Sequence, residues 1–325
     1  MKVLVIGAAG MIGRKLCERL RTDGRVGDTG ITDLLMADAV AGNLGTDIAY
    51  ARNVLVDLAQ PDAAAKLLAS RPDLIFHLAA IVSGEAEQNF AKGYAVNLDG
   101  TRALFEAIRA TENYRPRLVY TSSIAVFGAP YDGPIADDFV HTPLSSYGTQ
   151  KAICELLLAD YSRRGFFDGV GIRLPNICVR PGKPNAASSG FFSSIIREPL
   201  AGREAILPVE DGVTQTHASP RATVQFLLHA ATMETGQLGA RRSVMMPGVP
   251  ATVGQQIAAL RRVAGAAVAA RIRHVPDPAI MAMVAGWPGT FATPRALSLG
   301  FTAENSFESI IRTHIEDDLG GHFVR

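Results

Sequence analysis

The sequence is poor in cysteine, has a single tryptophan and contains no long apolar run. Its three cysteines (Cys17, Cys154 and Cys178) are far apart and not clustered with histidine, which argues against disulfides and a metal site and favours a reducing compartment. No run of about 18 uncharged apolar residues occurs, so no membrane span is predicted. Lysine plus arginine (32) nearly balance aspartate plus glutamate (31), which disfavours a nucleic-acid partner. We expect a soluble, cytoplasmic protein.

Apolar material is abundant, and the chain is long enough for two domains. It has 325 residues, 48% of them hydrophobic, whereas a typical domain has about 100–200 residues. From Arg180 the sequence RPGKPNAASSG is rich in Pro, Gly and Ser and has no periodicity, which is typical of a loop. We therefore predict one domain over residues 1–180 and a smaller mixed α/β domain over 181–325, some of whose segments return to the sheet of the first.

Strand-length apolar runs alternate with helical patterns in the first domain. Strands are predicted over Lys2–Ile6, Leu34–Ala37, Val54–Leu58, Leu74–Leu78, Arg117–Thr121 and Val170–Pro175. Helices are predicted over Ile12–Arg21, Asp62–Ser70, Phe90–Ala110 and Tyr147–Arg164, and beyond residue 180 over Ser193–Leu200, Ala222–Ala231, Val253–Val263 and Ser306–Ile315. Continuous apolar strands alternating with amphipathic helices indicate a doubly wound parallel sheet of the α/β class.

A glycine-rich turn directly follows the first predicted strand and opens the first helix. Small residues there let the backbone approach a pyrophosphate, and the helix N-terminus supplies free N–H donors. The residues expected to bind it are Gly7, Ala9, Gly10, Met11, Ile12 and Gly13. The alternative is a tight turn that binds nothing.

The choice of cofactor is expected at the end of the second strand. Asp38 follows Gly13 at a somewhat longer interval than the usual ~20 residues. A carboxylate there accepts hydrogen bonds from both ribose hydroxyls of NAD and repels the 2′-phosphate of NADP. Asp57 and Leu58, at the expected end of the third strand, are placed near the adenine. NAD is therefore predicted, with a solvated strand-end aspartate as the alternative interpretation of Asp38.

Tyr147 and Lys151 are four residues apart, on one face of a predicted helix. A tyrosine is a poor base at neutral pH, and a nearby lysine cation favours its phenolate. Alone, a tyrosine and a lysine at this spacing are as often ordinary surface residues of a helix. A catalytic role for the pair is supported by Ser123. Its hydroxyl is expected at the carboxyl edge of the sheet, where ligands of such sheets bind.

Two further segments are expected at the same edge. Leu78, Ala79 and Ala80 are small or apolar residues that leave room for a cofactor across the end of the fourth strand. Asn97, in the helix that follows, is available to position a backbone segment or a water molecule.

Together these motifs resemble the extended short-chain dehydrogenase/reductase family, over roughly Met1 to Gly182. The resemblance implies a Rossmann-type NAD-binding domain in an oxidoreductase acting on a CH–OH group. It further implies that Tyr147 is the general base, that Lys151 binds the nicotinamide ribose and favours the phenolate, and that Ser123 orients the reacting hydroxyl. Asn97 would support a proton relay. Pro175 and Asn176 would border the nicotinamide.

The later segments depart from the sugar-nucleotide members of this family. Arg221 stands where those enzymes usually carry a carboxylate, and Arg180 and Lys183 occupy the loop that would bind the sugar. Arginine grips carboxylates with paired hydrogen bonds. These segments resemble family members that oxidise the four-carbon sugar acid D-erythronate at C2. Candidate substrate-binding residues are Ser83, Ser123, Tyr147, Asn176, Arg180 and Arg221, and which cation holds the carboxylate stays open.

Other interpretations stay open for the whole chain. A sugar-nucleotide epimerase or dehydratase would use tightly held NAD without net release of NADH, and an inactive NAD sensor would have no need of the intact Tyr147–Lys151 pair. The family also implies a homodimer or larger homo-oligomer through the helices at 90–110 and 147–164. The apolar segment Met281–Pro288 fits a core, a lid or an interface equally well.

Overall fold

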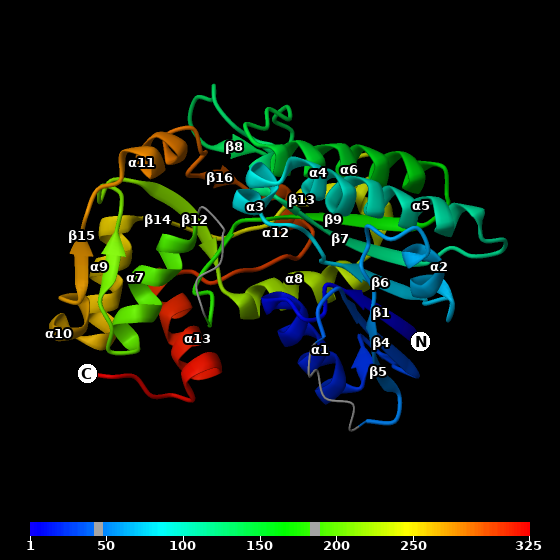
Figure 1. Cartoon of the computed structure of the whole chain (residues 1–325), viewed down its shortest axis with the longest axis horizontal. Coiled ribbons are helices and arrows are strands. Elements are labelled where there is room, and N and C mark those ends of the chain that lie inside the picture. Colours follow the sequence, from blue (N-terminus) through cyan, green and yellow to red (C-terminus); the bar gives the residue numbers. More distant parts are fainter. Residues whose placement is uncertain (42–47, 183–188) are drawn as a thin grey trace. The chain divides into compact units, whose positions relative to one another are not determined.

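The computed structural model describes residues 1–41, 48–182 and 189–325 (Figure 1). The chain forms two compact units that interleave along the sequence. Unit 1 comprises Met1–Val126, Ser145–Arg173 and Val224–Val244, and unit 2 comprises Phe127–Leu144, Leu174–Thr223 and Met245–Arg325. The chain passes between the two units more than once, and unit 1 includes residues 224–244 from beyond residue 180. Lys183 and Ser188, from the predicted loop, lie outside the described residues.

A seven-stranded sheet forms the centre of unit 1. Its strand order is β13-β9-β7-β6-β1-β4-β5, and the pairs from β7 to β5 are parallel. The bounds are β1 Lys2–Ile6, β4 Asp33–Asp38, β5 Ala51–Leu55, β6 Leu74–His77, β7 Arg117–Ser123, β9 Asp168–Leu174 and β13 Ser243–Met245. The predicted α/β class with a doubly wound sheet is thus confirmed, and β13 is a late segment that pairs with this sheet.

The third predicted strand was wrong in its bounds. It was expected over Val54–Leu58, but β5 begins at Ala51 and ends at Leu55. Arg52 and Asn53 are exposed, because β5 is an edge strand with one face toward solvent. An apolar run therefore does not mark its start, and Asp57 and Leu58 lie beyond its end.

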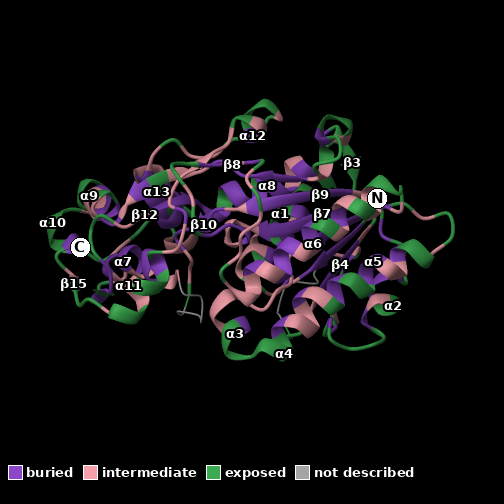
Figure 2. Ribbon diagram, turned by 90° about the horizontal axis from the view of Figure 1, so that it is seen from above, coloured by how far each residue is buried: buried purple, intermediate pink, exposed green. Residues whose placement is uncertain are grey.

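Helices cover the sheet of unit 1. They are α1 Met11–Asp23, α2 Ala63–Leu68, α3 Ser83–Gln88, α4 Phe90–Gly93, α5 Thr101–Ala110 and α6 Ser146–Arg163. The single helix predicted over Phe90–Ala110 is instead α4, a π-helical stretch at Tyr94–Gly100 and α5. Figure 2 shows the strands of the sheet buried, whereas α5 and α6 alternate buried and exposed faces. Their buried faces share one core with the strands, in which Leu104 and Leu158 are fully enclosed.

Unit 2 is built from small sheets and helices around its own core. Its sheets have the orders β10-β12-β14, β11-β15 and β16-β8. The strands are β8 Ile135–Ala136, β10 Asn176–Ile177, β11 Ala205–Leu207, β12 Thr214–Ala218, β14 Val249–Thr252, β15 Ile272–His274 and β16 Phe291–Ala292. The helices are α7 Gly190–Leu200, α9 Val253–Ala264, α10 Ala266–Ala269, α11 Pro278–Val284, α12 Pro294–Ser298 and α13 Phe307–Leu319.

Four short elements and one longer helix, α8, complete the chain. They are the hairpin β2 Arg25–Val26 with β3 Thr29–Gly30, the helix α8 Pro220–Thr232, and the 3-10 turns at Ile124–Val126 and Thr235–Leu238. The segment Met281–Pro288, which the sequence left open, belongs to α11 and the turn after it. Val284 is buried in the core of unit 2, and Met281 and Trp287 pack against that core.

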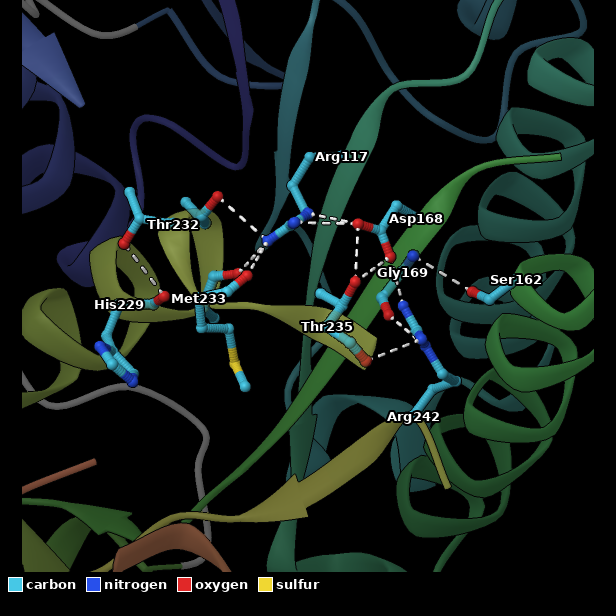
Figure 3. A network of polar contacts seen from close by, with 11 residues as sticks. Arg117, Ser162, Asp168, Gly169, His229, Thr232, Met233, Thr235 and Arg242 are labelled. Carbon is cyan, nitrogen blue, oxygen red and sulfur yellow. Dashed lines mark hydrogen bonds and ion pairs between the residues drawn. The ribbon is translucent and has the colours of Figure 1, made fainter. Parts of the chain in front are cut away.

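An ion-pair network ties the amino ends of β7 and β9 to the segment after α8 (Figure 3). Asp168 lies between the guanidinium groups of Arg117 and Arg242, and Thr235 donates to it from 2.8 Å. Burial acts to raise the pKa of Asp168, but the Thr235 hydrogen bond and the two cations prevail and lower it. Arg117 also donates to the backbone carbonyls of Ala230, Ala231 and Met233. The network thus neutralises the C-terminal end of α8.

Candidate functional site

The loop between β1 and α1 has the close contacts that a nucleotide-binding turn requires. Gly7 has a φ of +90°, a left-handed conformation that favours glycine. A Cβ at Gly13 would lie 2.0 Å from the Gly7 carbonyl oxygen, so only glycine lets α1 start this close to the strand. Gly10 is the N-cap of α1 and offers no side-chain cap, which leaves the first N–H groups of the helix for a ligand.

Asp38 ends β4 beside this loop. Its Oδ2 accepts a hydrogen bond from the Ala9 amide at 2.8 Å, and its Oδ1 accepts one from the Val40 amide at 3.0 Å. The carboxylate and the glycine loop are therefore held together in unit 1. An anion-binding helix start next to a carboxylate that can accept ribose hydroxyls fits NAD.

We predict that Gly13→Ala lowers the free energy of unfolding of the NAD-free protein by about 1–3 kcal/mol, because the new methyl group collides with backbone. Gly10→Ala is the matched control, since its Cβ would lie 3.3 Å from the nearest atom, the Gly7 carbonyl oxygen. Denaturant unfolding of both variants measures this. Equal stabilities would contradict the packing argument.

The other residues expected near the cofactor follow the ends of strands. Leu78, Ala79 and Ala80 follow β6 and are half-buried. Asp57 is exposed and Leu58 is buried; both lie after β5 and do not end it as predicted. Pro175, in unit 2, is a buried residue between β9 and β10.

Tyr147 and Lys151 both lie on α6 of unit 1, and Ser123 is the last residue of β7. The Lys151 ammonium lies 5.7 Å from the centroid of the Tyr147 ring. The Ser123 hydroxyl accepts a hydrogen bond from the Ala125 amide at 3.1 Å, which fixes it at the strand end. Ser145 caps α6, so Tyr147 stands in the first turn of the helix, where the dipole favours an anion.

Lys151 is the buried cation of this group. It is 2% exposed, and its Nζ donates to the Thr121 carbonyl at 2.8 Å. Burial lowers the pKa of Lys151 to about 8, and the nearby carboxylate of Glu155 partly opposes this decrease. Because about 8 is still above neutrality, the side chain is mostly a cation at pH 7.

Asn97 connects the loop after β6 to α6. Its Oδ1 accepts from the Ile81 amide at 2.7 Å, and its Nδ2 donates to the Ile81 carbonyl at 3.0 Å and to Gln150 Oε1 at 2.7 Å. Asn97 thus positions a backbone segment next to Lys151, and this is one of the two roles expected of Asn97. The sequence did not single out Gln150, although it directly precedes Lys151. Ser83, one of the candidate substrate-binding residues, is the first residue of α3.

Arg180 and Asn176 are held together in unit 2. Arg180 Nη2 donates to Asn176 Oδ1 at 2.9 Å and to Ser189 Oγ at 2.8 Å, and its Nε donates to the Ile177 carbonyl. The backbone of Arg180 is bonded to Ser193 and Arg197 of α7. The guanidinium is thus a preorganised, half-buried cation that also ties its loop to the start of α7.

A buried histidine fixes the other end of the Asn176 amide. Because Asn176 Oδ1 accepts from Arg180, its Nδ2 faces His217 Nδ1 at 3.1 Å and donates to it. A neutral imidazole has one N–H, which must then be on Nε2. The structure places Gln256 Nε2 3.0 Å from His217 Nε2, and two N–H groups cannot donate to each other, so we assign this amide the opposite orientation, with its oxygen toward the ring. As placed, Gln256 Oε1 is buried without a partner among the described residues.

This geometry makes stability depend on pH. Burial, with Arg180 nearby, lowers the pKa of His217 to about 3. In the unfolded chain the imidazole binds a proton below about 6.5, so the unfolded state gains stability as pH falls. We therefore expect the stability advantage of the wild type over His217→Gln to shrink by about 1.4 kcal/mol per pH unit below pH 6. Urea unfolding from pH 7 to 5 measures it, and a constant difference would contradict the buried neutral ring.

Arg221, the other cation expected to bind substrate, lies at the start of α8. Its guanidinium is 43% exposed and is paired with Glu316 and Asp317 of α13. Two carboxylates thus compensate its charge at the surface.

Comparison with known proteins places this geometry in a family. The model of the NAD dependent epimerase/dehydratase family matches residues 3–216. The D-erythronate dehydrogenase of Cupriavidus necator is 45% identical over 321 residues, 98% of both chains. That of Haemophilus influenzae is 39% identical over 319 residues, 98% of this chain and 100% of its own. A crystal structure described as the nucleoside-diphosphate-sugar epimerase from Agrobacterium tumefaciens is 58% identical, covers 99% of this chain and 95% of its own, and has a TM-score of 0.95.

The chain belongs to the NAD dependent epimerase/dehydratase family and is an NAD-dependent oxidoreductase of the short-chain dehydrogenase/reductase type. The predicted family and cofactor are thereby confirmed. None of the helices within the described ranges has the length and hydropathy needed to span a bilayer. Over the same ranges, no group of His, Cys, Asp and Glu side chains is arranged to hold a metal ion.

Proposed function

We propose that the protein oxidises D-erythronate to 2-dehydro-D-erythronate with NAD. The observation that carries the proposal is the identity to two D-erythronate dehydrogenases over 98% of this chain. The buried Lys151 beside Tyr147, with Ser123 at the strand end, supplies the groups that oxidation of a secondary hydroxyl needs.

In the proposed mechanism, Ser123 holds the reacting hydroxyl and Tyr147, as phenolate, removes its proton. Lys151 favours that phenolate through its positive charge, and the first turn of α6 adds the field of the helix dipole. When bound, NAD supplies the acceptor for the hydride that leaves the substrate carbon. The glycine loop, Asp38 and Lys151 are the residues that would hold the cofactor.

Arg180 is the proposed partner of the substrate carboxylate. It is half-buried and preorganised, and a guanidinium binds a carboxylate with directed hydrogen bonds. Arg221 is a poorer candidate because Glu316 and Asp317 already pair with it. Asn176 acts in this proposal by orienting Arg180.

A sugar-nucleotide epimerase is the second candidate. It is favoured by the Agrobacterium tumefaciens structure, whose description names that activity and whose sequence is 58% identical. The same tyrosine, lysine and serine would serve either reaction, since both begin with removal of a hydroxyl proton and a hydride. The two functions differ in whether NADH leaves the enzyme.

Purified protein incubated with NAD and a panel of four- to six-carbon sugar acids, beside UDP- and dTDP-sugars, tests the proposal. We expect net NADH formation with D-erythronate. Absence of NADH with every acid, together with epimerised sugar nucleotide, would contradict it and favour the second candidate.

We also propose that the protein is a homodimer or a larger homo-oligomer. Phe90 of α4 is 60% exposed and Leu156 of α6 is 65% exposed, and both are large apolar side chains on the outer face of unit 1. Leu156→Glu is expected to shift the mass measured by light scattering to that of one chain of 34.5 kDa. A monomeric wild type would contradict the assignment.

A further inference from the structure

Lys151 is a buried cation, and none of the described carboxylates forms an ion pair with it. Among the described residues, the only hydrogen-bond acceptor of its ammonium is the Thr121 carbonyl, and no carboxylate lies within ion-pair distance of Nζ. Glu155, one turn further along α6, is held by Arg173, whose Nη2 lies 2.8 Å from Glu155 Oε2. Because an unpaired buried charge is strongly disfavoured, something else must stabilise this ammonium.

Aromatic rings face the ammonium instead. Lys151 Nζ lies 4.7 Å from the centroid of the Tyr120 ring and 5.7 Å from that of Tyr147. Both distances are within the range of about 6 Å over which the negative face of a ring attracts a cation. Tyr120 is the closer ring and is fully buried, so water does not weaken the attraction.

The Tyr120 ring is rigidly placed. It comes from β7 and is packed into the core of unit 1 with Leu118, Cys154 and Leu158. The imidazole of His77 on β6 meets it edge to face, with centroids 5.5 Å apart and planes at 71°. Close packing on all sides leaves the ring face fixed beneath Nζ.

We propose that Tyr120 is a positioning residue whose ring face keeps Lys151 protonated and holds its ammonium beside Tyr147. The inference rests on the proposed function, in which Lys151 favours the phenolate of Tyr147. Tyr120 acts only through Lys151, and its hydroxyl has no part in this role. An aliphatic side chain of similar volume would fill the core but would not stabilise the cation.

The groups around Nζ make the protonation of Lys151 sensitive to loss of the Tyr120 ring. Those that titrate are Tyr120 on β7, His77 on β6, and Tyr147, Cys154 and Glu155 on α6. Burial lowers the pKa of His77 to about 3 and raises that of Tyr120, so both are neutral at pH 7. With the pKa of Lys151 already lowered to about 8, a further decrease of one unit would leave half the protein without the cation at pH 7.

The test replaces Tyr120 with side chains that differ in ring charge but hardly in shape. Tyr120→Phe keeps the ring and removes the hydroxyl. Phenylalanines that carry one to three fluorines at position 120 weaken the negative charge of the ring face stepwise. Tyr120→Leu removes the ring. Lysine carbon-13 NMR of the NAD-free protein follows the titration of Lys151. The sequence has only six lysines, and the Lys151 signal is the one missing from Lys151→Met.

We expect Tyr120→Phe to titrate like the wild type and each added fluorine to lower the midpoint of Lys151, by about one pH unit in total. The activity at pH 7 should fall in the same order, about twofold for the trifluoro variant, because the protonated fraction of Lys151 falls from about nine tenths to one half. Because fluorination hardly changes shape, these variants remain informative if Tyr120→Leu does not fold. An identical midpoint in the Phe and trifluoro variants would overturn the inference.

Lys151→Met separates this inference from the proposed function. If its activity and pH profile equal those of the wild type, the proposed role of Lys151 in catalysis is wrong, whatever the NMR titration shows. If Lys151→Met is impaired and fluorination leaves the lysine titration unchanged, the role of Tyr120 alone is wrong.

Discussion

Replacing Tyr147 with phenylalanine is expected to lower kcat by about 10³-fold, because removal of one positioned acid–base group typically costs 10²–10⁴-fold. The ring stays in the first turn of α6, so the binding constant for NAD, measured by protein fluorescence, should change little. Tyr161→Phe is the matched control. Tyr161 lies on the same helix, but its hydroxyl donates to Glu106, away from Lys151.

An active Tyr147→Phe would contradict the assignment of the general base. So would an equal loss of activity in Tyr161→Phe, since that would indicate a general sensitivity of α6 to loss of a hydroxyl. Loss of NAD binding in Tyr147→Phe would move the role of the hydroxyl from proton transfer to cofactor binding.

The second large effect is expected at Arg180. Arg180→Leu should lower kcat/KM for D-erythronate by about 100-fold, corresponding to one or two hydrogen bonds to a charged group at about 1.5–3 kcal/mol each. Arg221→Leu removes the same charge from a surface ion pair and should change kcat/KM by less than about threefold. Steady-state kinetics with varied acid concentration measures both.

Arg180 also holds its own loop, so stability must be followed in the same variants. Thermal unfolding will show whether loss of the contacts to Asn176 and Ser189 weakens unit 2. A fall in kcat/KM for the acid without a change in NAD binding supports the carboxylate role. Equal kinetic effects of Arg180→Leu and Arg221→Leu would contradict it.

Local signals in the sequence were sufficient for most of the sheet. β1 was predicted with its observed bounds and β4 to within one residue at each end, because both are apolar strands buried on two faces. The bounds of β5 were predicted wrongly because it is a half-exposed edge strand whose residues at 51–53 are mostly polar. The π-helical turn at Tyr94–Gly100 interrupts an otherwise continuous helical pattern, and no residue type marks it.

The site was predictable only where chemistry and local spacing coincide. The glycine loop and the Tyr147–Lys151 pair have characteristic spacings, so the sequence alone pointed to them. The contacts of Asn97 with Ile81 and Gln150, and those of His217 with Asn176 and Gln256, join residues far apart in the chain. No periodicity encodes such pairs, because the tertiary fold chooses the partner.

The proposed reaction is oxidation of a sugar acid at C2 with net release of NADH. It is tested most directly with D-erythronate carrying deuterium at C2, incubated with the enzyme and NAD, followed by mass spectrometry of the nucleotide. We expect one deuterium in each NADH formed and an equal amount of 2-oxo acid. Release of unlabelled NADH, or no NADH at all while sugar nucleotides are epimerised, would contradict it.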